Sequence, residues 1–320
     1  MSPTKTQIDA ANAELRDIPV ELIDRNVENP RLIFRSGELE ELLRSIQEYG
    51  VQVPISVYRE GKRFILIDGE RRWRCSLKLN KKTIPALVQE KPSPLSNLLL
   101  MFNIHSLREQ WDLLTIAAKL PRVTELLTEE LGRRPTEADL ADKTGLSRST
   151  LRRCKLLIEL PEQYREEMLA ELQRPKPQQK LTEDFFIEME RALTTVSRSM
   201  PGAIPNRDKV RKILISKYRE GIIKNRTDFR FLAKIARAEK VHVDESKAEK
   251  VLKRVFTQNH YSLKEAYEDS VSFAYTEREL ATRIRGLLEQ LTLLRANNLE
   301  ENLREPLKQL AARISALLKA

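Results

Sequence analysis

The chain has 320 residues, enough for two or three domains that each bury a core, and 32 % of the residues are charged. Lysine and arginine exceed aspartate and glutamate by ten, which favours a polyanionic partner such as nucleic acid. The longest apolar runs, such as 98–104, are far shorter than the roughly 20 residues that cross a bilayer, and residues 1–24 lack a signal core, so we expect a cytoplasmic protein with no membrane partner.

The first 94 residues alternate short apolar, β-branched runs with helical apolar stripes, each bounded by turn residues. These patterns predict strands at 18–23, 53–58, 63–67 and 83–88 and helices at 36–49 and 71–79. The turn at 60–62 makes a hairpin of the second and third strands. Together the segments predict one compact α/β unit.

Gly69 stands where the strand that ends at Ile67 gives way to a helix. Such a junction points free backbone N–H groups and the positive end of the helix dipole at an anion. Arg71, Arg72 and Arg74 add forked donors that match phosphate oxygens, and they complete a candidate phosphate cradle. A solvated basic helix start, with Glu70 in a salt bridge, would give the same pattern.

From Leu95 onward the pattern is almost uninterrupted helix, and residues 136–160 are typical of a helix-turn-helix. Thr136 and Asp139 predict a capping box, Gly145 ends the first helix, and Ser147 caps the second. The candidate DNA contacts are Thr136, Ser147, Arg148, Ser149, Thr150, Arg152, Arg153 and Lys155. The alternative is a helical hairpin with a solvated basic face.

The remaining helices follow a polar linker at 173–180. In residues 209–237, cations alternate with apolar side chains, which predicts helices with a basic face. This face could contact DNA phosphates, or it could be an ordinary solvated surface. Leucine stripes at 280–294 and 299–318, interrupted by two asparagines, predict a helical hairpin and favour homodimerisation. We therefore expect four parts: 1–94, 95–172, 173–272 and 273–320.

Cys75 and Cys154 lie far apart in the sequence, and the chain has only three histidines, which argues against a zinc site or a disulfide scaffold. Cys75 directly follows Arg74, where a helix start lowers the pKa of a thiol. A position packed behind the arginines favours a core thiol instead, and we expect both cysteines to be buried.

Three segments in order, 42–55, 69–74 and 84–86, resemble the amino-terminal domain of ParB-type partition proteins. The order continues in 147–150 and 156–162, which are similar to the central DNA-binding domain of the same family. This resemblance covers residues 15–165, and it favours the phosphate cradle over an ordinary surface.

The resemblance implies an α+β ParB/sulfiredoxin-like domain followed by an all-α helix-turn-helix domain and helical C-terminal domains. It also implies a homodimeric clamp on double-stranded DNA of the nucleoid or a plasmid, closed by CTP with Mg²⁺, with a Walker-type ATPase as candidate partner. The residues that match the family's nucleotide motifs are Gly50, Val51, Gln52, Pro54, Gly69, Glu70, Arg71, Arg72, Arg74 and Asn103.

Two positions depart from the family pattern. Phe102 stands where the family has a carboxylate, which leaves Asn103 as the candidate metal contact and argues against more than weak CTP hydrolysis. Val53 stands where many members have glutamine, which weakens selectivity for cytosine and leaves another nucleoside triphosphate open.

The first functional hypothesis is a sequence-specific DNA-binding protein, gated by a nucleotide, that acts in partition or in gene regulation. The second is an enzyme of the same fold family, a nucleotide-dependent kinase or a nuclease, with Glu70 or Asp68 as general base. Both carboxylates are better explained as groups that orient the arginines. The third is a transcription regulator that binds no nucleotide.

Overall fold

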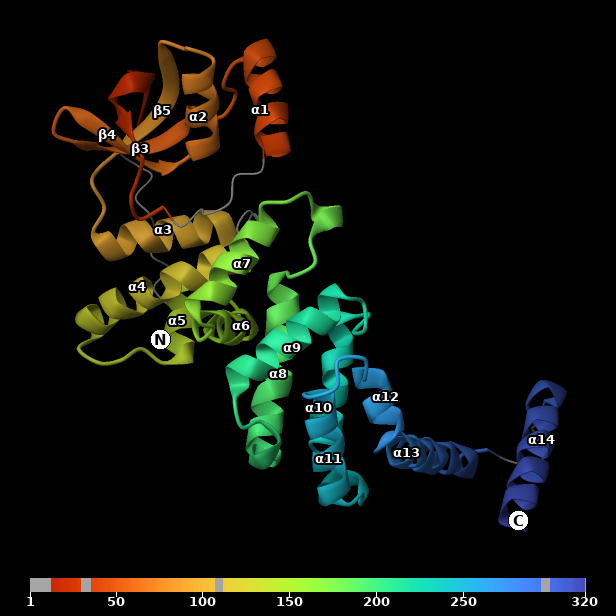
Figure 1. The fold of residues 1–320 in the computed structure, drawn as a ribbon. Coiled ribbons are helices and arrows are strands. Elements are labelled where there is room, and N and C mark those ends of the chain that lie inside the picture. The colour runs from red at the N-terminus through yellow and green to blue at the C-terminus, as the bar shows by residue number, and fades with distance from the viewer. Residues whose placement is uncertain (1–12, 30–35, 107–111, 295–299, 320) are drawn as a thin grey trace. The chain divides into compact units, whose positions relative to one another are not determined.

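The computed structural model describes residues 13–29, 36–106, 112–294 and 300–319, and the chain divides into two compact units, Met1–Arg191 and Ala192–Ala320. Figure 1 shows the first unit as a small sheet with helices, continued by more helices, and the second as helices throughout. The expected α/β beginning and helical remainder are confirmed. The finer division into four parts stays a prediction.

The sheet of the first unit has five strands in the order β1-β5-β3-β4-β2. The strands are β1 (Glu14–Pro19), β2 (Ile23–Asp24), β3 (Ile55–Glu60), β4 (Arg63–Asp68) and β5 (Thr83–Gln89). β3 and β4 form the predicted antiparallel hairpin, while β5 runs parallel to β3 and antiparallel to β1. β1 begins earlier than predicted because its polar residues pair along β5, from Glu14 opposite Val88 onward.

The core of this sheet is formed by apolar side chains from all five strands and from the 3-10 helix Val20–Leu22. Its buried members are Ile18, Val20, Ile23, Ile55, Val57, Leu66, Ile84 and Ala86. Two helices, α1 (Ser36–Tyr49) and α2 (Glu70–Lys78), pack on each other, and α2 also contacts β3. The helix α3 (Pro94–Ser106) contacts β4 and leads into the helical part of the unit.

The rest of the first unit is helical. Its helices are α4 (Leu113–Leu131), α5 (Glu137–Thr144), α6 (Arg148–Ile158), α7 (Glu162–Leu172) and the start of α8 (Glu183–Ser199). Contacts join α4 to α3 and to α6, and α5 to α6. Three leucines of this part, Leu146 before α6 and Leu151 and Leu157 on it, are buried.

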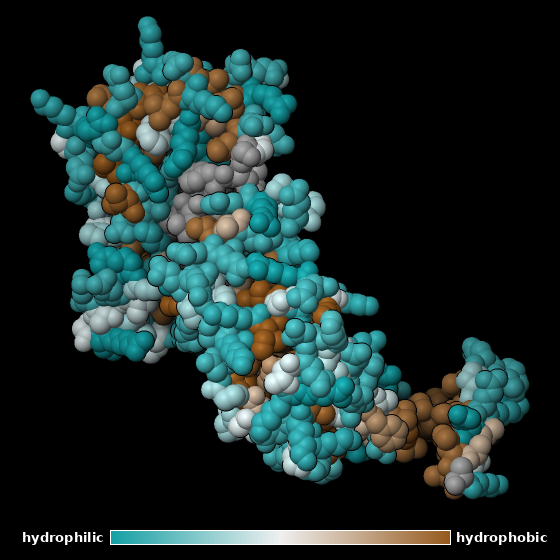
Figure 2. Space-filling model, in the orientation of Figure 1, coloured by the Kyte–Doolittle hydropathy of each residue, from teal (hydrophilic) through white to brown (hydrophobic). Residues whose placement is uncertain are grey.

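The second unit contains α9 (Arg207–Arg219), α10 (Phe229–Ile235), η6 (Ala238–Val241), α11 (Glu245–Val255), α12 (Leu263–Glu268), α13 (Ser272–Thr292) and α14 (Glu301–Leu318). The cations of 209–237 do not form one basic face, because Arg211 and Lys217 are buried. No residue described in α13 or α14 is buried, and Figure 2 shows apolar side chains gathered on this part of the surface. Homodimerisation through these stripes stays a prediction.

Among the described residues, no helix combines the length and the apolar character that crossing a membrane requires.

Candidate functional site

Gly69 turns the chain from β4 into α2 with a φ of +97°, in the left-handed region that favours glycine. A Cβ atom at this position would lie 2.5 Å from Cγ2 of Ile55 on β3. Gly69 has no side chain that could cap α2, so the first backbone N–H groups of the helix are left for another acceptor. The predicted junction is confirmed, and its geometry suits an anion.

Arg72 joins this junction to the segment before β3. Its Nη1 donates to the carbonyl oxygens of Val53 at 2.6 Å and Pro54 at 2.7 Å, and its Nη2 donates to Asp68 at 2.9 Å. The structure therefore brings together the two candidate nucleotide segments, 50–54 and 69–74. It gives Arg72 the role of holding them together.

Glu70 is a buried carboxylate that orients Arg74. Its Oε1 accepts from Nε of Arg74 at 2.9 Å and from Nη2 at 2.6 Å, and its Oε2 accepts from Nδ2 of Asn29 at 2.5 Å. Arg25 lies 3.9 Å away. With both oxygens engaged, Glu70 is poorly placed to act as a general base.

The loop after β2 connects the cradle with the helices, which the sequence analysis missed. Asn29 contacts Glu70, while its neighbour Glu28 pairs with Lys119 at 3.3 Å and Arg122 at 3.8 Å on α4. Asn26, buried in the same loop, accepts a bond from the backbone N–H of Glu28 at 2.9 Å. The sequence signal was a pair of asparagines, Asn26 and Asn29, just after the first predicted strand, since asparagine side chains often bond to nearby backbone groups in loops.

Phe102 is fully buried, so the position where the family has a carboxylate belongs to the core. Asn103 belongs to α3, but its side chain lies outside the described part of the chain. Within the described residues no three His, Cys, Asp or Glu side chains are grouped as metal ligands. The described side chains therefore do not form a site that could hold a metal ion with protein ligands alone.

The helix-turn-helix is formed as predicted. Thr136 and Asp139 make a reciprocal capping box at the start of α5, and Gly145 ends that helix with a φ of +72°. The hydroxyl of Ser147 accepts from the backbone N–H of Thr150 at 3.0 Å and begins α6. Asp139 also pairs with Arg133 at 2.8 Å, and these hydrogen bonds hold the pKa of Asp139 well below its usual range.

The predicted DNA contacts on and around α6 divide into three groups. Arg148, Ser149, Arg152 and Lys155 are exposed, together with Ser147 before the helix. Arg153 lies half-buried on another side, where it donates to Asp184 of α8 at 2.6 Å. Thr136 and Thr150 take part in the caps that position the two helices. The geometry therefore suits base or phosphate contact for the first group and gives Arg153 a packing role.

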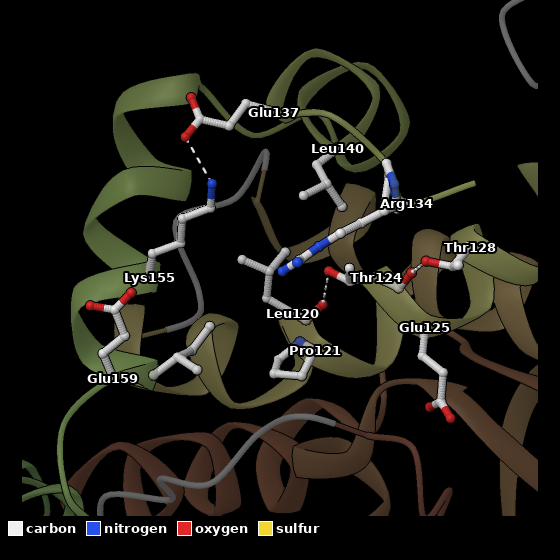
Figure 3. A pocket seen from close by; sticks show the side chains of 12 residues that line it. Leu120, Pro121, Thr124, Glu125, Thr128, Arg134, Glu137, Leu140, Lys155 and Glu159 are labelled. Atoms are coloured by element: carbon white, nitrogen blue, oxygen red, sulfur yellow. Dashed lines mark hydrogen bonds and ion pairs between the residues drawn. The ribbon is translucent and has the colours of Figure 1, made fainter.

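Glu137, which sequence reasoning missed, lies beside the exposed cations of α6. It accepts from Lys155 at 2.8 Å and from Arg152 at 3.2 Å, and these bonds lower its pKa. Figure 3 shows Glu137 and Lys155 at the rim of a groove of about 720 Å³ between α4, α5 and α6. Leu120, Pro121, Leu140 and Ile158 give the groove an apolar floor.

With this geometry in view, comparison with known proteins identifies the amino-terminal part. Residues 4–101 match the ParB N-terminal domain. The chain is 38 % identical over 151 residues to a probable chromosome-partitioning protein ParB of Pseudomonas putida, covering 47 % of this chain and 49 % of that protein.

Other relatives give similar coverage. A chromosome-partitioning protein ParB of Caulobacter vibrioides is 31 % identical over 176 residues, which are 51 % of this chain and 55 % of that protein. A nucleoid occlusion protein of a Geobacillus strain is 33 % identical over 160 residues, 49 % of this chain and 53 % of that one. The chain spans about half the length of the curated relatives it matches.

Among solved structures, a truncated Caulobacter crescentus ParB complexed with CTP-γ-S is 28 % identical with a TM-score of 0.29, covering 56 % of this chain and 92 % of that one. The same protein complexed with the centromeric parS site is 24 % identical with a TM-score of 0.38, covering 59 % and 93 %. TM-scores this low add no argument about the architecture.

Proposed function

We propose that this chain is a ParB-like, sequence-specific DNA-binding protein whose amino-terminal domain is gated by a nucleoside triphosphate, CTP in the first instance. It would act as a homodimeric DNA clamp in chromosome or plasmid partition, associated with the nucleoid or a plasmid, or in gene regulation. If the protein acts in partition, its proposed partner is a Walker-type ATPase.

The observation that carries the proposal is the junction at Gly69. The start of α2 has no side-chain cap, and Arg72 ties it to the 50–54 segment. A triphosphate needs dipoles and guanidinium forks, and this junction offers both. When bound, the triphosphate would supply oxygen ligands for Mg²⁺, while the residues of the chain bind and orient its phosphates.

The DNA part of the proposal is supported by α6. Its caps fix the helix against α5, and Arg148 and Arg152 lie exposed on it, as base reading in a major groove requires. The enzyme alternative is less well supported, because Asp68 and Glu70 both pair with arginines. A nucleotide-free regulator remains the competing function.

Nucleotide binding is tested by titrating labelled CTP, ATP and GTP into the full chain with Mg²⁺, with and without DNA. We expect Arg71→Ala to weaken binding of the preferred nucleotide at least tenfold, about 1.4 kcal/mol. Arg44→Ala, an exposed arginine on α1, is the matched control and should bind normally. Absence of binding by all three nucleotides would favour the nucleotide-free regulator.

Specific DNA binding is tested by selecting a target duplex from a random pool and measuring its affinity. Arg148→Ala should lower the specific affinity by about 1 to 3 kcal/mol. Arg153→Ala, on the same helix but paired with Asp184, should lower stability and leave base discrimination intact. Equal discrimination by wild type and Arg148→Ala would exclude this side chain from base reading.

A further inference from the structure

The groove between α4, α5 and α6 has the size and the lining of a small-molecule site. Ligand pockets in proteins usually measure about 300 to 1,000 Å³ and combine a mainly apolar lining with a few polar groups. The volume of this groove is about 720 Å³, and its apolar floor includes the buried Leu120 and Leu140 and the half-buried Ile158. A small molecule with an apolar body therefore suits the groove.

The wall that α4 contributes to the groove offers few hydrogen-bond donors. Leu120, Thr124 and Thr128 recur at every fourth position, so they lie along one side of the helix. The hydroxyl of Thr124 donates to the carbonyl oxygen of Leu120 at 2.8 Å, and that of Thr128 donates to the carbonyl oxygen of Thr124 at 2.7 Å (Figure 3). Because both O–H groups are used within α4, recognition of a polar ligand group falls to the charged side chains of the lining.

Arg134 is a cation of this lining that no described carboxylate neutralises. It belongs to the connection between α4 and α5, and Figure 3 shows its side chain extended into the groove. It forms no ion pair with any residue that the structure describes. Two of the three carboxylates in the lining are already engaged, Glu125 with Arg122 at 2.6 Å and Glu137 with Lys155 at 2.8 Å.

The third carboxylate of the lining, Glu159, lies on the opposite side of the groove from Arg134 (Figure 3). An anionic ligand group therefore belongs at Arg134, where a planar guanidinium can donate two parallel hydrogen bonds to a carboxylate. The apolar body of the same ligand covers the floor, and burial of this area favours binding. A cationic ligand is disfavoured, because Arg134 and Lys155 repel it.

The groove shares its rim with the face of α6 that is proposed to contact DNA. Lys155 lines the groove and is exposed on that face, and its partner Glu137 also accepts from Arg152. A further negative charge in the groove competes with DNA phosphates for these cations. Because linkage between two ligands is reciprocal, bound DNA weakens binding in the groove by the same factor.

We propose that this groove binds a small organic carboxylate with an apolar body, and that its occupation opposes DNA binding by α6. The first statement rests on the groove alone. The second rests on the proposed function, in which α6 is the helix that contacts DNA.

The probe for the site is cinnamate, a planar aromatic carboxylate, and its neutral counterpart of the same shape is cinnamamide. Binding to the full chain is followed by NMR of the leucine and isoleucine methyl groups. We expect cinnamate to shift the methyl signals of Leu120, Leu140 and Ile158 with a Kd of a few millimolar or tighter. It should bind about three- to fivefold more tightly than cinnamamide, as an exposed ion pair predicts. Equal affinity for the two probes, or shifts confined to methyl groups outside the groove, would overturn the proposal.

Arg134→Gln should lower the affinity for cinnamate to that for cinnamamide and leave binding of cinnamamide unchanged. Arg133→Gln is the matched control, because Arg133 belongs to the same connection but pairs with Asp139 at 2.8 Å and lies outside the lining. It should bind both probes as the wild type does. Wild-type affinity of Arg134→Gln for cinnamate would remove the basis for an anion at this position.

Ile158→Ala shortens an apolar side chain of the floor, so it should weaken both probes by a similar factor. Circular dichroism checks that each variant folds. Unchanged binding of both probes by Ile158→Ala would place them outside the groove.

The opposition to DNA is tested by fluorescence anisotropy of a labelled duplex of random sequence, with chloride replacing cinnamate in the reference at the same ionic strength. Saturating cinnamate should lower the duplex affinity about threefold or more, and excess duplex should raise the Kd of cinnamate by the same factor. Cinnamamide should leave the duplex affinity unchanged. An unchanged duplex affinity with cinnamate in the groove would overturn the opposition. If the proposed function fails instead, no duplex binds, and the methyl shifts still show whether the groove takes the carboxylate.

Discussion

Glu137, the first residue of α5, holds the ammonium group of Lys155 on α6 at 2.8 Å and the guanidinium of Arg152 at 3.2 Å. One carboxylate thus engages two cations on the exposed face of the second helix of the helix-turn-helix. Phosphates must compete with Glu137 for these cations, which lowers affinity for DNA of any sequence. The same contact positions both side chains before DNA arrives.

Glu137→Gln should therefore raise affinity for non-target duplex several-fold and narrow the ratio of specific to non-specific binding. The measurement is anisotropy on target and random duplexes at matched salt. Glu125→Gln removes a different ion-paired glutamate, on α4 beside Arg122, and should change neither affinity. If Glu137→Gln instead reduced the affinity for both duplexes, Glu137 would help DNA binding by positioning Lys155 and Arg152 more than it hinders it by competing with the phosphates.

Gly69→Ala should destabilise the amino-terminal domain by about 2 to 4 kcal/mol, since a side chain at a φ of +97° is strained and its Cβ meets Ile55 at 2.5 Å. Urea denaturation followed by tryptophan fluorescence, to which Trp73 of α2 contributes, would measure the loss. Gly61→Ala, in the β3–β4 turn, has a φ of +61° and nothing within 4 Å of the added Cβ, so it should cost only about 1 kcal/mol. Equal losses would refute steric contact with Ile55.

Lys217 is buried and donates to the carbonyl oxygens of Val255 and Tyr261, both at 2.6 Å. Burial lowers its pKa to about 8 from 10.5 in the unfolded chain. Between these values the unfolded state binds more protons, so the free energy of unfolding should rise with pH, by at most about 3 kcal/mol. The neutral amine still has two N–H donors for the two carbonyls.

Lys217→Met removes this titration. The wild type should gain stability relative to the variant as the pH rises from about 8 to 10.5, in urea denaturation at several pH values. Lys212→Met is a suitable control, because Lys212 is an exposed lysine of the same helix paired with Asp208. If the free energies of unfolding of the wild type and Lys217→Met differed by the same amount at every pH in this range, the lowered pKa of Lys217 would be contradicted.

The two cysteines should react slowly with thiol reagents in the folded protein at pH 8. Burial raises the pKa of Cys75, and it raises that of Cys154 to about 12, so little thiolate forms at either. Urea should expose both and speed labelling many-fold. Rapid labelling of Cys75 in the native protein would contradict the burial and the raised pKa of this thiol.

Local patterns in the sequence determined much of this protein. The capping boxes, turn glycines and alternating strands act within a few residues, so the β3–β4 hairpin, α2 and the α5–α6 pair could all be predicted from neighbouring residues. The turn at Gly69 could also be predicted, because the apolar strand before it and the helix-forming residues after it are adjacent in the sequence.

Only the tertiary structure decided which partner each polar side chain takes. Arg72 and Arg71 are neighbours in one motif, yet Arg72 is committed to the carbonyls of residues 53 and 54, and Arg153 to Asp184. Glu137 meets Lys155 across a turn, and Lys217 meets carbonyls about forty residues away. Hydrogen bonds and ion pairs are short-ranged, so their partners are set by how the helices pack rather than by spacing along the chain.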